Sequence, residues 1–331
     1  MTGAFVFAIC TLVVFVFTTV ISKYLIPILK SKKMGQKILD IGPRWHKSKE
    51  GTPTMGGLAF FVSVTAFAIV FSVIYAINRP GELDTLYGFL MAIGLAVSNG
   101  LIGIIDDMTK FKKSQNEGLT PSQKFFLQLL FAALYLFGMT RLGLIHTSVK
   151  IPFTDISLEL GVVYYALSMI LITGLVNSVN LTDGIDGLCS MVTFVVGLFF
   201  FGCGISFDSI ILSAIGGLLC GACGGFLVYN YYPARVFMGD TGSLFLGGLV
   251  SGGAFLLGEP YIIIFAGIIY ITESVSVILQ VAYFKTTGKR LFKMSPIHHH
   301  FERCEWSEIK IDYVFSIVTA LFCVFAYLML R

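Results

Sequence analysis

The sequence predicts an all-α integral membrane protein of about ten transmembrane helices, forming one domain over residues 1–331. Of these residues 56% are hydrophobic and only 13% are charged, whereas soluble domains carry about 25% charged residues. Apolar runs of roughly 20 residues, the length that crosses a bilayer, recur from end to end. The runs lack the polar outer face that helices of a soluble core would need, which argues against a soluble fold.

The spans are separated by clusters of proline, glycine and charged residues. They are expected at residues 4–28, 56–77, 85–105, 124–140, 161–176, 188–205, 210–229, 243–257, 261–282 and 312–330. The first run is followed by Lys23 and by further spans, without a small-residue cleavage site before a soluble domain. It is therefore interpreted as a membrane helix and not as a removed signal peptide. Ten spans place both termini on one side of the membrane.

Basic residues are divided unevenly between the connections. The connections after the odd-numbered spans hold 18 of the 23 basic residues. These are Lys30, Lys32, Lys33, Lys37, Arg44, Lys47, Lys49, Lys110, Lys112, Lys113, Lys124, Arg235, Lys285, Lys289, Arg290, Lys293, Arg303 and Lys310. Because cytoplasmic loops carry an excess of lysine and arginine, these connections are expected in the cytoplasm and the termini outside.

Acidic residues cluster on the same side, at the ends of spans. The clusters are Asp106 with Asp107, Asp183 with Asp186, and Asp240. A carboxylate held near hydrocarbon is costly, so each cluster indicates a functional site. We expect one cytoplasmic active site assembled from several loops.

Asp106 and Asp107 follow the apolar residues 100–105 and precede three lysines. Two adjacent carboxylates can share a divalent cation, or one of them can act as a base or nucleophile. The lysines suit phosphate groups. Taken alone, the pair is also compatible with an ordinary helix end whose charges are solvated.

Residues 177–187 combine two asparagines, a threonine, two aspartates and two glycines without any basic residue. Such oxygen ligands with glycine-permitted turns suit Mg²⁺ and hydroxyl-rich substrates. Further along, Asp240 stands between glycines at the start of a span, where it could hold a metal that bridges phosphates. Phe237 could stack on a flat base or simply pack at the membrane interface.

Two further segments carry weaker signals. The glycine-rich run 51–57 opens the second span, where free backbone N–H groups could receive an anion, although it lacks the ending of a P-loop. Residues 298–300 are three consecutive histidines in the last cytoplasmic connection. Phosphate binding or substrate positioning is the favoured role for them, and zinc binding or surface histidines without function are the alternatives.

Carboxylates, a metal and cations are the groups that phosphoryl transfer requires, since that reaction depends on charge neutralisation and alignment. The sequence shows no H-E-x-x-H motif and no Ser-His-Asp order typical of hydrolases. A cytoplasmic site at the bilayer surface would allow a soluble nucleotide-linked donor to meet a lipid acceptor.

Together these motifs resemble those of the phospho-N-acetylmuramoyl-pentapeptide transferase (MraY) family, a branch of the polyprenyl-phosphate N-acetylhexosamine-1-phosphate transferases. The resemblance covers nearly the whole chain and is carried, in order, by residues 51–57, 106–107, 180–187, 237–243 and 296–302. The Asn-Leu-Thr-Asp-Gly and Gly-Asp-Thr-Gly-Ser runs are highly specific together. The three histidines and the glycine-rich run point to this family over its relatives.

The resemblance implies a reaction in the bacterial cell membrane, at a site facing the cytoplasm. Phospho-N-acetylmuramoyl-pentapeptide would pass from UDP-MurNAc-pentapeptide to undecaprenyl phosphate with Mg²⁺ as cofactor. UMP would be released and lipid I formed, the first membrane step of peptidoglycan synthesis. The resemblance also implies a homodimer, and no nucleic-acid partner is expected.

By matching positions, Asp240 is expected to bind Mg²⁺. Asp106 and Asp107 are expected to act at the lipid phosphate and are further candidate metal ligands. Phe237 would stack on the uracil. The full set of expected substrate-binding residues is Lys49, Thr54, Lys110, Asn177, Asn180, Asp183, Gly184, Asp186, Asn230, Phe237, Gly239, His298, His299 and His300.

Some points stay open at this level. The family often has Tyr-Leu-Lys after the aspartate pair, whereas this chain has Met108-Thr109-Lys110, so the roles of the later lysines are not assigned. Asp106 could be the base in a direct transfer, or an aspartate could be the nucleophile of a covalent one. The alternative functions are a transferase for UDP-N-acetylglucosamine and a transporter. A transporter should carry ionisable residues near the centres of its spans, and Glu273 is the one acidic residue well inside a predicted span.

Overall fold

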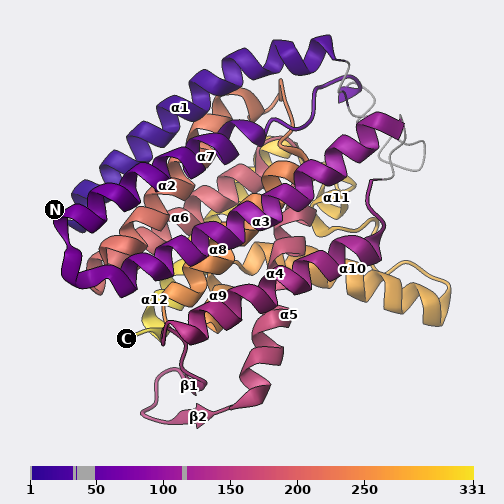
Figure 1. Ribbon diagram of the computed structural model, residues 1–331. Helices are drawn as coiled ribbons and strands as arrows, with labels where there is room; N and C mark the ends of the chain where they lie inside the picture. Colours follow the sequence, from indigo (N-terminus) through magenta and orange to yellow (C-terminus); the bar gives the residue numbers. More distant parts are fainter. Residues whose placement is uncertain (1, 33–34, 36–48, 114–117) are drawn as a thin grey trace.

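Helices make up most of the structure, a computed structural model that describes residues 2–32, 35, 49–113 and 118–331 (Figure 1). The helices are α1 Gly3–Ser31, α2 Leu58–Asn78, α3 Leu83–Lys113, α4 Pro121–Arg141, α5 Val162–Thr182, α6 Leu188–Ser206, α7 Ile210–Asn230, α8 Gly239–Leu256, α9 Ile263–Ala266, α10 Ile268–Thr287, α11 Ile297–Glu302 and α12 Glu308–Met329. A short antiparallel hairpin of β1 (Ser148–Lys150) and β2 (Ser157–Glu159) lies between α4 and α5. Lys33, Lys37, Arg44 and Lys47, which entered the expected charge asymmetry, lie outside the described residues.

In the described part of the chain, nine helices are long and apolar enough to cross a membrane: α1 to α7, α10 and α12. This confirms the prediction of a multi-pass, all-α membrane protein. The remaining predicted span, 243–257, coincides largely with α8, which is 18 residues long and rich in glycine. Residues 241–255 of α8 are all buried, so this helix forms part of the centre of the bundle.

Two helices run further than the sequence indicated. α3 continues past the expected end at residue 105, and α5 continues past 176. The prediction that Asp106, Asp107 and the asparagines of the 177–187 segment lie in connecting loops is therefore wrong. α5 accommodates Asn177 because its side-chain amide donates to Thr173 O (2.8 Å) and to Gln128 Oε1 (2.7 Å) inside the bundle.

The ninth predicted span, 261–282, is not one continuous helix. It begins with a 3₁₀ turn at Pro260–Ile262 and with α9, and a break at Gly267 separates these from α10. The C-terminal part of α10 projects from the bundle (Figure 1), and its residues 282–287 are all exposed.

Close packing between α3 and α8 determines where the acidic residues meet. A Cβ atom on Gly248 would lie 2.8 Å from Ala96 Cα, and one on Gly252 would lie 2.6 Å from Ala92 Cβ. Small residues allow membrane helices to approach at this range. The contact brings the first turn of α8 against the C-terminal third of α3. Both chain termini lie toward the opposite end of the bundle (Figure 1).

Candidate active site

Three carboxylates meet where α3 and α8 approach each other. Asp106 and Asp107 lie on α3, and Asp240 lies in the first turn of α8. One oxygen from each lies within 4.8 Å of the others, and among the described residues this is the only such group of three acidic, histidine or cysteine side chains. The approach requires glycine at position 103, because a Cβ there would stand 2.2 Å from Asp240 O.

Two lysines bind this group of carboxylates. Lys110 Nζ lies 2.7 Å from Asp106 Oδ2 and 3.0 Å from Asp240 Oδ2. Lys124 Nζ lies 2.6 Å from Asp240 Oδ2 and 3.5 Å from Asp106 Oδ2. We call Asp106, Asp107, Asp240, Lys110 and Lys124 the carboxylate–lysine cluster.

Sequence reasoning counted Lys124 only as a basic residue of a cytoplasmic connection. It lies in the first turn of α4, whose N-terminus is capped by Thr120. A lysine in the first turn of a helix is unfavourable to the helix dipole, and that position was an available signal that the charge serves another purpose.

Asp107 is fixed by the start of α8. Its Oδ2 accepts from Thr241 N (2.9 Å) and from Thr241 Oγ1 (2.7 Å), and its Oδ1 accepts from Asp240 N (3.3 Å). Only 5% of Asp107 is exposed. Asp106 differs, because one oxygen accepts from Leu119 N (2.8 Å) while the other faces the lysines.

Asn180 supports the metal-ligand candidate Asp240 from the last turn of α5. Its Nδ2 donates to Asp240 Oδ1 and to Ser243 Oγ, both at 2.8 Å. Asp183 follows directly at the C-cap of α5. Burial by the surrounding protein, reinforced by the negative charges of Asp240 and Asp107, raises the pKa of the Asp183 carboxyl well above its usual range.

A second ionic cluster lies beside the first. Lys49 Nζ is 2.7 Å from Asp186 Oδ1 and 2.6 Å from Glu308 Oε2. Asp186 also accepts from Ala234 N (2.8 Å) and is 2% exposed. Burial opposes the charge of Lys49, but attraction by Glu308 and Asp186 outweighs it and raises the pKa of the ammonium group. Glu308 was missed from the sequence, because it precedes the last expected span (312–330) and belongs to none of the motifs described above.

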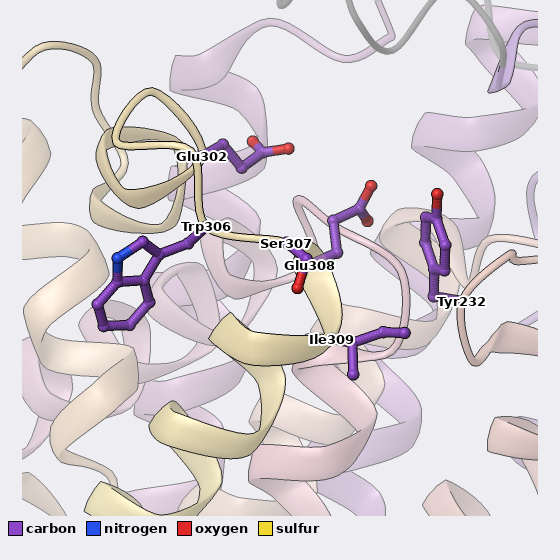
Figure 2. A pocket seen from close by; sticks show the side chains of 6 residues that line it. All are labelled: Tyr232, Glu302, Trp306, Ser307, Glu308 and Ile309. Carbon is purple, nitrogen blue, oxygen red and sulfur yellow. The ribbon is translucent and has the colours of Figure 1, made fainter.

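Glu308 borders a pocket of about 250 Å³ that is lined by Tyr232, Glu302, Trp306, Ser307, Glu308 and Ile309. Figure 2 shows the carboxyl groups of Glu302 and Glu308 and the Tyr232 hydroxyl directed toward the same side, with the Trp306 indole turned away. The pocket therefore combines aromatic side chains with two acidic groups, of which Glu308 also contacts Lys49.

The three histidines have three different surroundings. His298 is buried, its Nδ1 lies 3.0 Å from Glu273 Oε2, and its Nε2 would lie 2.2 Å from a Cβ on Gly184. His299 Nδ1 lies 2.5 Å from Glu302 Oε2. His300 Nδ1 accepts from Lys293 N (3.2 Å), and the His300 ring packs edge-on against Phe292. His298 thus packs against Gly184 in the 183–187 loop, and the expectation that all three histidines line one substrate site stays a prediction.

The glycine-rich run does not present free N–H groups in the way we expected. Gly56 N donates to Phe237 O (2.8 Å) and Gly57 N donates to Met238 O (3.0 Å). The run therefore fastens the start of α2 to the segment before Asp240, and the anion-binding interpretation of these two amides is wrong. Thr54 remains beside the carboxylates, since a Cβ on Gly239 would lie 2.8 Å from Thr54 Oγ1 and 2.7 Å from Asp107 Oδ2.

The remaining expected residues are partly engaged by the fold. Asn230 is 1% exposed, and its amide donates to Val236 O (3.0 Å) while accepting from Ser190 Oγ (3.3 Å). Asn177 is held by Gln128. Phe237 is half-buried, and its backbone N–H donates to Pro53 O (2.8 Å). Direct contact of these side chains with a substrate stays a prediction.

Known proteins resemble this chain over nearly its whole length. The model for glycosyl transferase family 4 matches residues 88–258, and a phospho-N-acetylmuramoyl-pentapeptide-transferase signature matches residues 49–61. A protein of Clostridium botulinum (strain Alaska E43 / Type E3) named phospho-N-acetylmuramoyl-pentapeptide-transferase is 45% identical over 317 residues, which cover 96% of this chain and 94% of the relative. Proteins of the same name from Clostridium perfringens (strain 13 / Type A) and Clostridium acetobutylicum (strain ATCC 824) are each 43% identical, covering 95% and 96% of this chain and 95% and 97% of their own lengths. The resemblance deduced from the motifs is thereby confirmed, and the chain belongs to the phospho-N-acetylmuramoyl-pentapeptide-transferase family.

Proposed function

We propose that the protein transfers phospho-N-acetylmuramoyl-pentapeptide from UDP-MurNAc-pentapeptide to undecaprenyl phosphate, forming lipid I and releasing UMP. The observation that carries the proposal is the carboxylate–lysine cluster, in which two ammonium groups and three carboxylates surround one point at the end of α3. The names of the relatives supply the sugar-peptide donor. They also favour this reaction over transfer from UDP-N-acetylglucosamine and over transport.

The cluster fits Mg²⁺. Its donor set consists of carboxylate oxygens, which Mg²⁺ prefers, and Asp106, Asp107 and Asp240 bring theirs within 4.8 Å of one another. The ammonium groups of Lys110 and Lys124 lie 2.6–3.0 Å from oxygens of Asp106 and Asp240, so these oxygens already attract cations. A Mg²⁺ ion held by Asp240 with Asp106 and Asp107 would supply neutralisation of the phosphate charges.

The two lysines have the position and charge needed to receive the phosphates of donor and acceptor. Asp106 Oδ2 faces the same point, so Asp106 can take the proton of the lipid phosphate. The freed phosphate oxygen then attacks the sugar-linked phosphorus of the donor, and the bond to UMP breaks as UMP leaves. Asp107 is less suited to this step, because both of its oxygens accept hydrogen bonds from the start of α8.

We assign recognition of the nucleotide to Lys49 and Asp186, two residues of the second ionic cluster, and to Phe237. Lys49 Nζ and the Asp186 carboxylate offer a donor and acceptors, and the half-buried Phe237 offers a ring for a planar base. This placement would keep the uridine end of the donor on one side and its diphosphate against the carboxylate–lysine cluster.

The test is product formation by the purified protein with UDP-MurNAc-pentapeptide, undecaprenyl phosphate and Mg²⁺. We expect UMP release together with a lipid product, and both should stop when a chelator is added. UDP-N-acetylglucosamine is supplied in parallel to establish donor choice. Folded protein that releases no UMP from the muramoyl donor would overturn the proposal.

We further propose that the site faces the cytoplasm, in line with the charge asymmetry of the sequence. Cys304 follows α11 and is partly exposed, whereas the other six cysteines are buried. A membrane-impermeant maleimide should therefore label inverted vesicles and not right-side-out ones, with Cys304→Ser as the unlabelled control. Labelling only from outside would reverse the topology.

The family resemblance also leads us to propose a homodimer, to be checked by mass measurement in detergent.

A further inference from the structure

Glu308 makes two contacts through a single carboxylate oxygen. Its Oε2 lies 2.6 Å from Lys49 Nζ and accepts from the backbone N–H of Asp186 at 2.9 Å. The three residues are far apart in sequence, by 122 and 259 positions from Glu308. One oxygen therefore joins the segment before α2, the loop between α5 and α6, and the start of α12.

Glu308 is held in place by a long helix. It is the first residue of α12, and the helix is capped at Ser307, whose Oγ accepts from Lys310 N (3.3 Å). α12 continues for 22 residues through the bundle. Lys49 and Asp186 lie outside the α-helices, before α2 and between α5 and α6, so the carboxylate of Glu308 ties both residues to a long helix.

The charge pattern makes Glu308 more than a packing contact. Lys49 stands between two carboxylates, each within 2.7 Å of its ammonium nitrogen. Without Glu308, Lys49 would pair with Asp186 alone, and the Asp186 N–H would lose its acceptor. A charged hydrogen-bonding partner usually contributes more binding free energy than a neutral one. Neutralising Glu308 should therefore make both the Lys49 ammonium group and the Asp186 backbone less firmly held.

The pocket of about 250 Å³ beside Glu308 places this residue at the boundary between solvent-accessible space and the ion pairs. Its side chain is 11% exposed, against 2% for Asp186. Glu308 is also separate from the carboxylate–lysine cluster, with which it shares none of the ion pairs in the described structure.

We propose that Glu308 is a positioning residue for the nucleotide of the donor, orienting the Lys49 ammonium and the Asp186 loop before the donor binds. The inference rests on the proposed function, which assigns nucleotide recognition to Lys49 and Asp186. It predicts a defect confined to the donor, since Glu308 has no contact with the groups assigned to the lipid phosphate.

The first test compares Glu308→Gln with Glu305→Gln, a matched change of an exposed glutamate three residues earlier. Glu308→Gln should raise the donor KM and the Kd for UMP roughly tenfold to hundredfold, the range of one charged hydrogen bond. Its kcat and its KM for undecaprenyl phosphate should stay within about twofold of the wild type. Glu305→Gln should change none of these values.

The pattern of constants separates positioning from a general loss of structure. Partial unfolding would lower the apparent kcat and leave the donor KM unchanged, which would contradict the proposal. An unchanged donor KM and an unchanged Kd for UMP in active Glu308→Gln would also overturn it. Wild-type protein without any UMP release would instead refute the proposed function itself, so the two failures are distinguishable.

A double-mutant cycle tests whether Glu308 acts through Lys49. In a Lys49→Met background, the additional change Glu308→Gln should raise the Kd for UMP by a smaller factor than in the wild type. Equal factors in the two backgrounds would show that the residues act independently, and the positioning role would be rejected.

Discussion

Gly103→Ala is the sharpest test of how the site is assembled. The added Cβ would stand 2.2 Å from Asp240 O, 2.4 Å from Asp240 C and 2.6 Å from Thr241 N. All three atoms are backbone, so no side-chain rotation can relieve the overlap. Ordinary van der Waals contact begins at 3.4 Å, so the first turn of α8 must move away from α3 by about 1 Å.

A displacement of that size moves Asp240 relative to Asp106 and Lys110. Misplacement of reacting groups by about 1 Å can lower a rate on the order of 10²-fold, and this is the loss of turnover that we expect. The overlap should also destabilise the fold by about 1–3 kcal/mol, the usual range for overpacking. UMP release measures the first quantity, and thermal unfolding in detergent measures the second.

Gly94→Ala supplies the matched control, because Gly94 lies on the same helix and a Cβ there would meet nothing within 4 Å. That variant should keep wild-type turnover and gain a little helix stability, since alanine is favoured over glycine in helices by roughly 1 kcal/mol. Gly103→Ala turning over within about twofold of the wild type would refute the claim that helix approach positions the aspartates.

Three further outcomes follow from the site. Asp106→Asn should lower turnover by about 10²–10⁴-fold, the usual contribution of a general base, and full activity would remove Asp106 from that role. Lys124→Met should reduce kcat/KM for the donor by roughly tenfold or more, as expected when a charged partner of a phosphate is lost. An unchanged kcat/KM would mean that Lys124 stabilises the fold and does not bind a phosphate. Asp183→Asn should raise the melting temperature at pH 7, because the raised pKa means that the folded state holds the proton more tightly than the unfolded state and loses stability as the pH rises above about 4. The gain should disappear below that pH, and a gain independent of pH would contradict the assignment.

The sequence was sufficient to predict the class of fold and to name the three carboxylates that the structure brings together. Hydrophobic runs are a local property, and they located the nine spans that the described structure contains, with errors at their ends. The acidic motifs were also local, so Asp106, Asp107 and Asp240 could be named together before any geometry was known. Their distances could not, because these depend on glycines such as Gly103 that are unremarkable in a membrane helix.

The errors at the ends of the spans share one physical cause. Polar residues such as Asn177 were interpreted as loop signals, yet in the bundle its amide finds partners on its own helix and on α4. Interior partners of this kind allow helices to carry polar side chains past the apparent end of a span. Lys124 and Glu308 were overlooked because neither belongs to a motif, and the partners that show their importance come from distant parts of the chain.

The adjacent aspartates show how one motif divides its work. Met238, the N-cap residue of α8, provides no side-chain hydrogen bond to the helix. The first N–H groups of α8 have no acceptor within the helix itself. Asp107 fulfils the capping role from another helix, accepting the N–H groups of Asp240 and Thr241, and its negative charge suits the positive end of the α8 dipole. This arrangement fixes Asp240 relative to α3 and leaves the neighbouring Asp106 to face the lysines. Loss of Asp107 should therefore disturb the position of Asp240, whereas loss of Asp106 should remove a reacting group from an otherwise intact site.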